Sequence, residues 1–170
     1  MTAPESSEGP RVPLLRQREI EARIVGPLLQ AVRDELGEEK TLQIARAVIA
    51  ELARQSGAEL ARTFGEATLV TFARSLDRWS EGGALEIEML EQSPQRLAFN
   101  VVRCRYAEMY RALGLADLGA TLSCTRDFAL VEGFNPEIEL TRTQTIMQGA
   151  THCDFRFAGP GAAAEPAKGE

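Results

Sequence analysis

Two stretches with the alternation typical of β-strands flank Gly149, and they constrain the fold more than any other feature of the chain. Both lie within residues 137–157, and strand-like runs on either side of a glycine predict a hairpin or a tight strand pair. Successive side chains of a strand point to opposite faces, so each run can be divided into two sets of residues.

The first stretch carries polar residues on its apolar face. Arg142 and Gln144 alternate in phase with Ile138, Leu140 and Ile146. A buried guanidinium or amide needs hydrogen-bond partners, so these two side chains either reach out to water or line a polar pocket against the core.

The second stretch contains the only histidine. In a strand, His152, Asp154 and Arg156 share one face, and the other face carries Cys153, Phe155 and Phe157. The polar face could form an acid–base and anion-binding row, because imidazole titrates near neutral pH and guanidinium pairs with carboxylates. The alternative is a surface strand with an ordinary Asp–Arg ion pair.

The order of elements predicts an α+β fold, with a helical N-terminal half packed on a mainly antiparallel sheet of about four strands. Gly26-Pro27 should kink or split the first helix. The second strand alternates apolar residues on both faces, so it is expected to be covered on both. The expected elements are helices within 12–79, strands at 84–92 and 97–103, helices at 106–113 and 115–128, and the strand pair at 137–157.

The first helices are expected to be amphipathic, with an apolar stripe on each that faces the core. They also offer a surface through which copies of the chain could associate as a homo-oligomer. The stripes comprise Leu15, Ile20, Ile24, Leu28, Val32 and Leu36, and then Leu42, Ala45, Val48, Ile49, Leu52, Ala53, Leu60 and Phe64.

Length and composition indicate one domain, expected at residues 11–157 between disordered ends at 1–10 and 158–170. The chain has 170 residues and a net charge of −6 without a Lys/Arg run, so a nucleic-acid partner is not expected. No apolar run approaches the roughly 20 residues of a membrane span. The first residues lack the features of a signal peptide, and three cysteines are an odd number, so reduced thiols in a cytoplasm are expected.

Each cysteine could be a nucleophile if its pKa is lowered and a base lies nearby. Cys104 is predicted at a strand end before a helix, between Arg103 and Arg105, and Cys124 precedes Asp127. The alternative for each thiol is a small buried apolar group. A zinc site would need all three cysteines and His152, but their spacing does not match known zinc motifs, so no metal is expected.

Two further carboxylates, Glu108 and Asp127, lie in the cysteine-bearing region, and either could orient a base or position water. Glu108 is interpreted as part of a solvated helix face. Asp127, close to Cys124, is the better candidate for proton transfer.

Five ordered segments together resemble the L-2-amino-thiazoline-4-carboxylic acid hydrolase family. They are C-R-Y-A-E-M-Y-R-A-L-G (104–114), L-G-A-T-L-S-C-T-R-D-F-A (118–129), E-G-F-N-P (132–136), R-T-Q-T-I-M-Q-G (142–149) and H-C-D-F-R-F (152–157). The resemblance implies a cytoplasmic, bacterial-type hydrolase without a cofactor. Such an enzyme opens a small carboxylate-bearing heterocycle, a cyclic amidine or amide, at a C–N bond; the reaction that names the family yields an N-carbamoyl amino acid.

That resemblance and the chemistry of the residues together predict the site. Cys153 is the first choice of nucleophile, followed by Cys124 and Cys104. His152, Asp127 or Asp154 would move protons. Arg142 or Arg156 would bind the substrate carboxylate, with Gln144 and Asn135 also facing the substrate.

A fainter resemblance to the 4-vinyl reductase type of small-molecule-binding domain leaves a second function open, namely a non-enzymatic binding or sensor domain with a similar α+β fold. A small structural zinc domain is the third.

Overall fold

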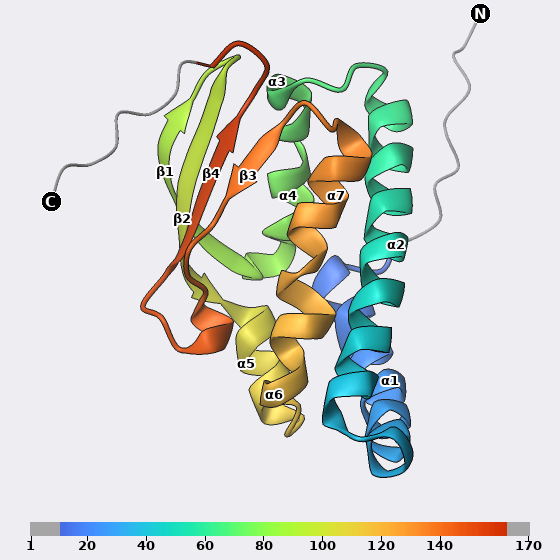
Figure 1. Ribbon diagram of the computed structural model, residues 1–170. Coiled ribbons are helices and arrows are strands. Elements are labelled where there is room, and N and C mark those ends of the chain that lie inside the picture. Colours follow the sequence, from blue (N-terminus) through green and yellow to red (C-terminus); the bar gives the residue numbers. More distant parts are fainter. Residues whose placement is uncertain (1–10, 163–170) are drawn as a thin grey trace, which may run out of the picture.

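The computed structural model describes residues 11–162, and the disorder predicted at 1–10 and 163–170 lies outside this range. A sheet forms one side of the molecule and helices cover one of its faces (Figure 1). The strands are β1 (Leu85–Gln92), β2 (Arg96–Cys104), β3 (Glu139–Thr141) and β4 (Cys153–Ala158), in the order β1-β2-β4-β3, and every pair is antiparallel. The predicted α+β class with a four-stranded antiparallel sheet is confirmed.

Two long helices, α1 (Leu14–Leu36) and α2 (Glu38–Phe64), open the described chain. The predicted break at Gly26-Pro27 is wrong, because α1 continues through Pro27. Pro27 and Arg23, whose carbonyl loses its usual helical partner at a proline, both lie on the exposed side of the helix. The shorter helical segments are α3 (Leu69–Phe72), α4 (Ser75–Trp79), η1 (Glu81–Gly83), α5 (Arg105–Ala112), α6 (Ala116–Gly119), the π-helical turn η2 (Ala120–Cys124), α7 (Arg126–Phe134) and η3 (Ile146–Gln148).

Helix α7 lies between the sheet and α2, and α2 and α7 approach each other through glycines (Figure 1). A Cβ atom on Gly57 would lie 2.1 Å from the backbone oxygen of Leu130, and one on Gly133 would lie 2.1 Å from that of Arg54. The two backbones can approach this closely only because neither glycine carries a side chain.

The core lies between the sheet and helices α3, α4 and α7. The inward residues of β2 and β4 alternate as predicted, with Phe99 stacked on Phe155 at 4.9 Å between ring centroids. Phe72 packs against Phe134 and Phe157 above this face. The prediction that β2 is covered on both faces is wrong, since its alternate positions are half-buried or exposed and no helix within residues 11–162 covers the other face (Figure 1).

The predicted apolar stripes of the first two helices do not all face the core. The residues of α1 that are buried are Ala22, Gly26 and Leu29, whereas Ile24 is 68% exposed and Leu28 is 60% exposed. On α2, Val48 and Leu52 are also exposed. Two of the three buried α1 residues, Ala22 and Gly26, are small, which allows neighbouring elements to pack closely against this face.

The strand predicted up to Ile146 ends at Thr141, so the hairpin does not turn tightly at Gly149. A connection of residues 142–152 joins β3 to β4 and contains η3, after which Gly149 adopts φ +97°. The Asp154 carboxylate accepts hydrogen bonds from the backbone amides of Thr143 and Gln144, both at 2.9 Å. These bonds replace the strand pairing that would have continued beyond Thr141.

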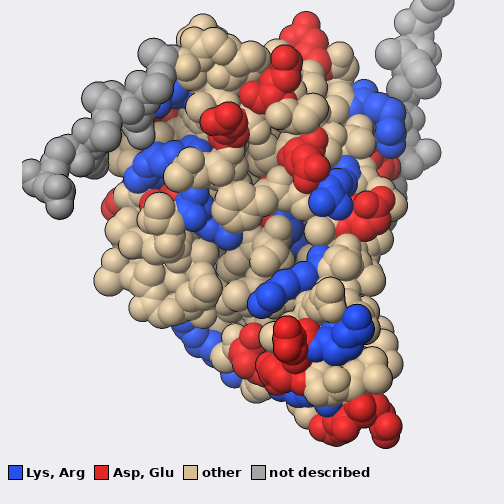
Figure 2. All heavy atoms as spheres, viewed as in Figure 1, with Lys and Arg blue, Asp and Glu red and all other residues tan. Residues whose placement is uncertain are grey.

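The predicted boundary at residue 158 falls inside β4, whose last residue is Ala158. Beyond the strand, the Gly159 amide donates to the Gln95 carbonyl at 2.8 Å. On the face seen in Figure 2, acidic and basic side chains are interspersed.

Candidate functional site

A cavity of about 110 Å³ lies between the sheet and the helices, and it gathers much of the chemistry predicted from the sequence. Its wall is formed by β1, β2, β4, α1, α4, α5 and the segment from η2 to α7. Its apolar and aromatic lining includes Leu14, Trp79, Leu85, Val101, Tyr106, Leu130 and Phe155. Its polar lining comprises Arg18, Cys104, Ser123, Cys124, Arg126, Asp127, Arg142 and Cys153.

An ion pair between Arg142 and Asp127 crosses one side of this cavity. The Arg142 side chain, 6% exposed, also donates to the Cys124 carbonyl at 3.0 Å. Its guanidinium lies over two rings, 5.0 Å from the centroid of Phe128 and 5.1 Å from that of Phe155. The sequence left two arrangements open for Arg142, a side chain that reaches out to water or one that lines a polar pocket, and the second is observed.

The Asp127 carboxyl is the candidate acid–base group. Burial raises its pKa to about 6, although Arg142, Arg126 and Arg18 act in the opposite direction. A carboxyl that titrates near neutral pH inside a cavity can accept and return a proton during a reaction.

All three thiols line the same cavity, so the structure brings together the three cysteines that the sequence had spread over 50 positions. Burial raises the pKa of Cys104 to about 11 and that of Cys124 to about 12. The pKa of Cys153 is also raised by burial, but the Ile146 amide donates to its Sγ at 3.2 Å and Arg142 acts in the same, lowering direction. Each thiol is therefore protonated at neutral pH in the unliganded protein.

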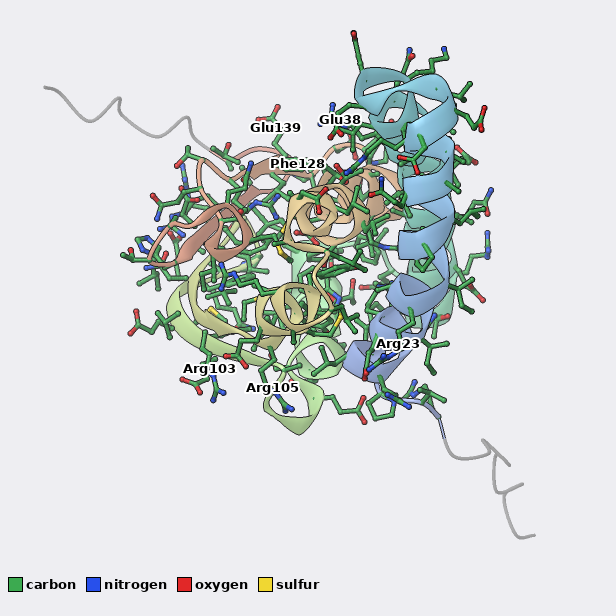
Figure 3. The ribbon with its side chains drawn as sticks, turned by 90° about the horizontal axis from the view of Figure 1, so that it is seen from below. Arg23, Glu38, Arg103, Arg105, Phe128 and Glu139 are labelled. Atoms are coloured by element: carbon green, nitrogen blue, oxygen red, sulfur yellow. The ribbon has the colours of Figure 1, made fainter. Side chains whose placement is uncertain are left out.

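The two arginines beside Cys104 do not activate it. Arg103 pairs with Glu108 at 2.9 Å and with Glu86 at 3.2 Å, and Arg105 donates to the Gly82 carbonyl. Figure 3 shows Arg103 and Arg105 at the edge of the molecule. The interpretation of Glu108 as a solvated residue agrees with its exposed ion pair.

The predicted row on β4 lies outside the cavity, because strand alternation turns it away from Cys153. The His152 ring is near Gln144 and Thr151, and the Gln144 amide donates to the His152 carbonyl at 3.1 Å. Asp154 binds the connection after β3. Although burial acts to raise its pKa, hydrogen bonds from Thr143 and Gln144 lower it overall.

The remaining predicted binding residues also hold the backbone together instead of facing the cavity. Arg156 donates to the carbonyls of Phe99 and Phe155 and to the Asn100 side chain. Asn135 donates to the Ala67 carbonyl at 2.7 Å and accepts from the Glu137 amide.

The sequence interpretation missed five polar or aromatic members of the wall: Arg18, Trp79, Tyr106, Ser123 and Arg126. Arg18 and Trp79 lie far from the cysteines in sequence, so only packing places them in the cavity. Arg126 could have been noticed, because it directly precedes Asp127.

No group of three or more His, Cys, Asp or Glu side chains within residues 11–162 is arranged to hold a metal ion. In the same range, no helix is both long enough and apolar enough to cross a membrane.

The fold and cavity define an α+β protein with a partly charged cavity between its sheet and its helices. The chain belongs to the L-2-amino-thiazoline-4-carboxylic acid hydrolase family, whose model matches residues 17–157. The family name supports a hydrolase at the level of the general class of enzyme.

A search of curated proteins finds no match. Among solved structures, one similar chain is the phenol-responsive sensory domain of the transcription activator PoxR, in a crystal structure with phenol. The two share 14% sequence identity with a TM-score of 0.45, over 80% of this chain and 73% of the other. A likeness this distant has no bearing on function.

Proposed function

We propose that this protein hydrolyses a small carboxylate-bearing heterocycle, a cyclic amidine or amide such as 2-amino-thiazoline-4-carboxylate, inside the cavity lined by Asp127 and the three cysteines. The proposal rests on the chemistry of the cavity wall more than on the volume of the cavity, which is of the same order as the roughly 150 Å³ of an apolar protein cavity that binds benzene. Its volume is about 110 Å³ and its wall combines apolar side chains with a few charged ones.

The observation that carries the proposal is the presence of Asp127 and Cys153 in one cavity, with the pKa of Asp127 raised to about 6. A thiol that is protonated at rest needs a base at the moment of attack. Asp127 lines the same wall, and burial raises its pKa to about 6, so it is assigned that role. Cys153 is preferred among the thiols because a backbone amide already donates to its sulfur.

The proposed reaction has two steps. Cys153 Sγ adds to the amidine carbon while Asp127 takes the thiol proton. The ring then opens as Asp127 gives this proton to the leaving ring atom, and the carbon stays bonded to Sγ. Water, deprotonated by Asp127, then displaces Sγ and forms the carbonyl, and the thiol regains its proton.

Atom balance decides which ring bond breaks. The amidine carbon of 2-amino-thiazoline-4-carboxylate keeps both nitrogens in an N-carbamoyl product. The bond that opens is therefore the one to the ring sulfur, not the C–N bond expected from the family resemblance, and this sulfur takes the proton from Asp127. In a cyclic amide without sulfur, the C–N bond opens, and Asp127 returns its proton to the leaving nitrogen.

The test is hydrolysis of 2-amino-thiazoline-4-carboxylate, followed by mass spectrometry of the N-carbamoyl-cysteine formed. We expect Asp127→Asn and Cys153→Ser to lower kcat/KM by about 100-fold or more, as expected for removal of an acid–base or nucleophilic group. Cys104→Ser and Cys124→Ser should keep kcat/KM within about tenfold of the wild-type value, since neither of these thiols takes part in the proposed reaction.

Asp77→Asn is the matched control for the charge change, because Asp77 is exposed on α4, outside the cavity. Circular dichroism verifies that each variant is folded, and Asp127→Glu keeps the charge if Asp127→Asn does not fold. Full activity in Cys153→Ser would remove covalent catalysis by this thiol, and full activity in a folded Asp127→Asn would remove the proposed base.

A second function, binding without turnover, is favoured by one observation: burial raises the pKa of all three thiols. Calorimetry that detects binding of the same compound without formation of product would favour this function. Labelling with a thiol reagent at neutral pH supplies a second criterion, since a binding domain should carry only unreactive thiols.

A further inference from the structure

The charges of the cavity wall do not balance once their partners within the protein are counted. Arg142 is paired with Asp127, and Arg18 is paired with Glu21 at 2.6 Å. Arg126 is the third guanidinium of the wall, and it forms neither a hydrogen bond nor an ion pair with any residue in the described range. One positive charge of the cavity is therefore left without a direct partner.

The position of Arg126 makes this charge costly. The residue begins α7 directly after the π-helical turn η2, and its side chain is half-buried. Burial lowers the pKa of Arg126, and the positive charge of Arg18 lowers it further, so the two guanidinium groups repel each other. A partly buried cation beside another cation is stabilised when an anion binds between them.

Arg142, in contrast, has little capacity left for a ligand. It binds Asp127 and the Cys124 carbonyl, and the rings of Phe128 and Phe155 lie against its guanidinium. Removing Asp127 from this pair in order to bind a second carboxylate would leave a buried charge unpaired.

We propose that Arg126, assisted by Arg18, binds the carboxylate of the small ligand, and that Arg142 serves to hold Asp127. The identity of the ligand rests on the proposed function, but the assignment of the carboxylate to Arg126 does not require turnover. Guanidinium groups suit this task because their planar fork matches the two oxygens of a carboxylate.

The proposal makes Arg126 a determinant of ligand specificity. A neutral ring of the same shape would fill the apolar part of the cavity without contacting this charge. The preference of the protein for the acid over the neutral ring should therefore depend on Arg126, whereas binding of the neutral ring should not.

The experiment is isothermal titration calorimetry with two probes, 2-amino-thiazoline-4-carboxylate and 2-amino-thiazoline, which lacks the carboxylate. Wild type should bind the carboxylate compound more tightly than the neutral one. Arg126→Gln should raise the Kd of the carboxylate compound by about 10- to 100-fold, the range for a lost charge-assisted hydrogen bond, and leave the Kd of the neutral compound unchanged. Arg126→Lys should recover part of the affinity.

Arg46→Gln is the matched control, because it removes the same charge from an exposed position of α2 outside the cavity. It should change neither Kd. Arg18→Gln should weaken binding of the carboxylate compound less than Arg126→Gln does, since Arg18 already has Glu21 as a partner.

The outcomes separate this proposal from the proposed hydrolysis. Binding that depends on Arg126 without any product supports the carboxylate site and contradicts the hydrolase. Three results would overturn the carboxylate site, whatever the turnover measurement shows. They are equal affinity of wild type and Arg126→Gln for the carboxylate compound, no preference of wild type for the carboxylate compound over the neutral one, and no binding of the carboxylate compound at all.

Discussion

At the scale of single residues, Arg142 shows how a charged side chain is buried directly after the end of a strand. The chain leaves β3 after Thr141, and the Arg142 side chain enters the cavity, where Asp127, a carbonyl and two aromatic rings surround it. Its charge is neutralised by Asp127, and its flat apolar faces are covered by rings. This arrangement joins the sheet side of the cavity to α7.

Arg142→Leu should lower the free energy of unfolding by about 3–5 kcal/mol, because removing one partner of a buried pair leaves the Asp127 charge uncompensated. Urea denaturation monitored by circular dichroism measures this change. Arg54→Leu is the control, because its ion pair with Glu132 is exposed and its loss should leave the urea midpoint almost unchanged. Equal effects of the two substitutions would contradict the structural role of Arg142.

The raised pKa of Asp127 predicts the pH dependence of turnover. A general base must be deprotonated, so kcat/KM should increase about tenfold per pH unit below about 6 and level off above it. Stopped assays between pH 4.5 and 8.5 measure this profile. The rising limb should disappear from whatever activity remains in Asp127→Asn, and a wild-type profile that is flat across pH 6 would argue against Asp127 as the base.

At the scale of elements, the crossing of α2 and α7 determines where Asp127 lies. Gly57 and Gly133 allow backbone contact between these helices, and α7 carries Arg126, Asp127 and Phe128 at its first turn. Any change that separates the two helices should therefore displace the charged side of the cavity.

Gly57→Ala should destabilise the protein by about 1–3 kcal/mol, the usual cost of overpacking, because its Cβ would lie 2.1 Å from the Leu130 oxygen. Differential scanning calorimetry measures the loss. Ser56→Ala, at the adjacent exposed position of the same helix, should leave the Tm unchanged or slightly higher because alanine favours helices. A Gly57→Ala variant with wild-type Tm would show that the helices can separate freely.

At the scale of the whole molecule, the apolar residues left on the outside of α1 and α2 support the expectation that copies associate through the N-terminal helices. Ile20, Ile24 and Leu28 recur every four residues on α1, and all are at least 45% exposed. On α2, Ile44, Val48 and Leu52 repeat the spacing with exposures of 39–53%. Exposed apolar stripes of this length are typical of contact surfaces.

We therefore expect wild type to form a homo-oligomer, and the double substitution Ile24→Glu and Leu28→Lys to dissociate it. Light scattering coupled to size-exclusion chromatography measures the mass of both. Val70→Lys is the control, since Val70 is 54% exposed but lies on α3, and it should not alter the mass. A monomeric wild type at high protein concentration would refute the expectation.

The sequence by itself determined the class of fold, the position of most elements and the buried faces of β2 and β4. Alternation placed Cys153, Phe155 and Phe157 on the buried face of β4, and the boundary at Cys104 was predicted correctly. These features depend on neighbours a few residues apart, so a local pattern is sufficient to predict them. The family resemblance was likewise visible in ordered motifs and is confirmed by the family model.

Only the tertiary structure decided which predicted residues form a site. It brought Arg142, Asp127 and the three thiols to one cavity, added Arg18 and Arg126, and left His152, Asp154 and Arg156 outside. The predicted row of His152, Asp154 and Arg156 lies outside this cavity because side chains of consecutive residues point apart, and the face carrying Cys153 is the one turned to the helices. Membership of a cavity depends on contacts between elements far apart in sequence, and a local pattern of residues does not encode how those elements pack.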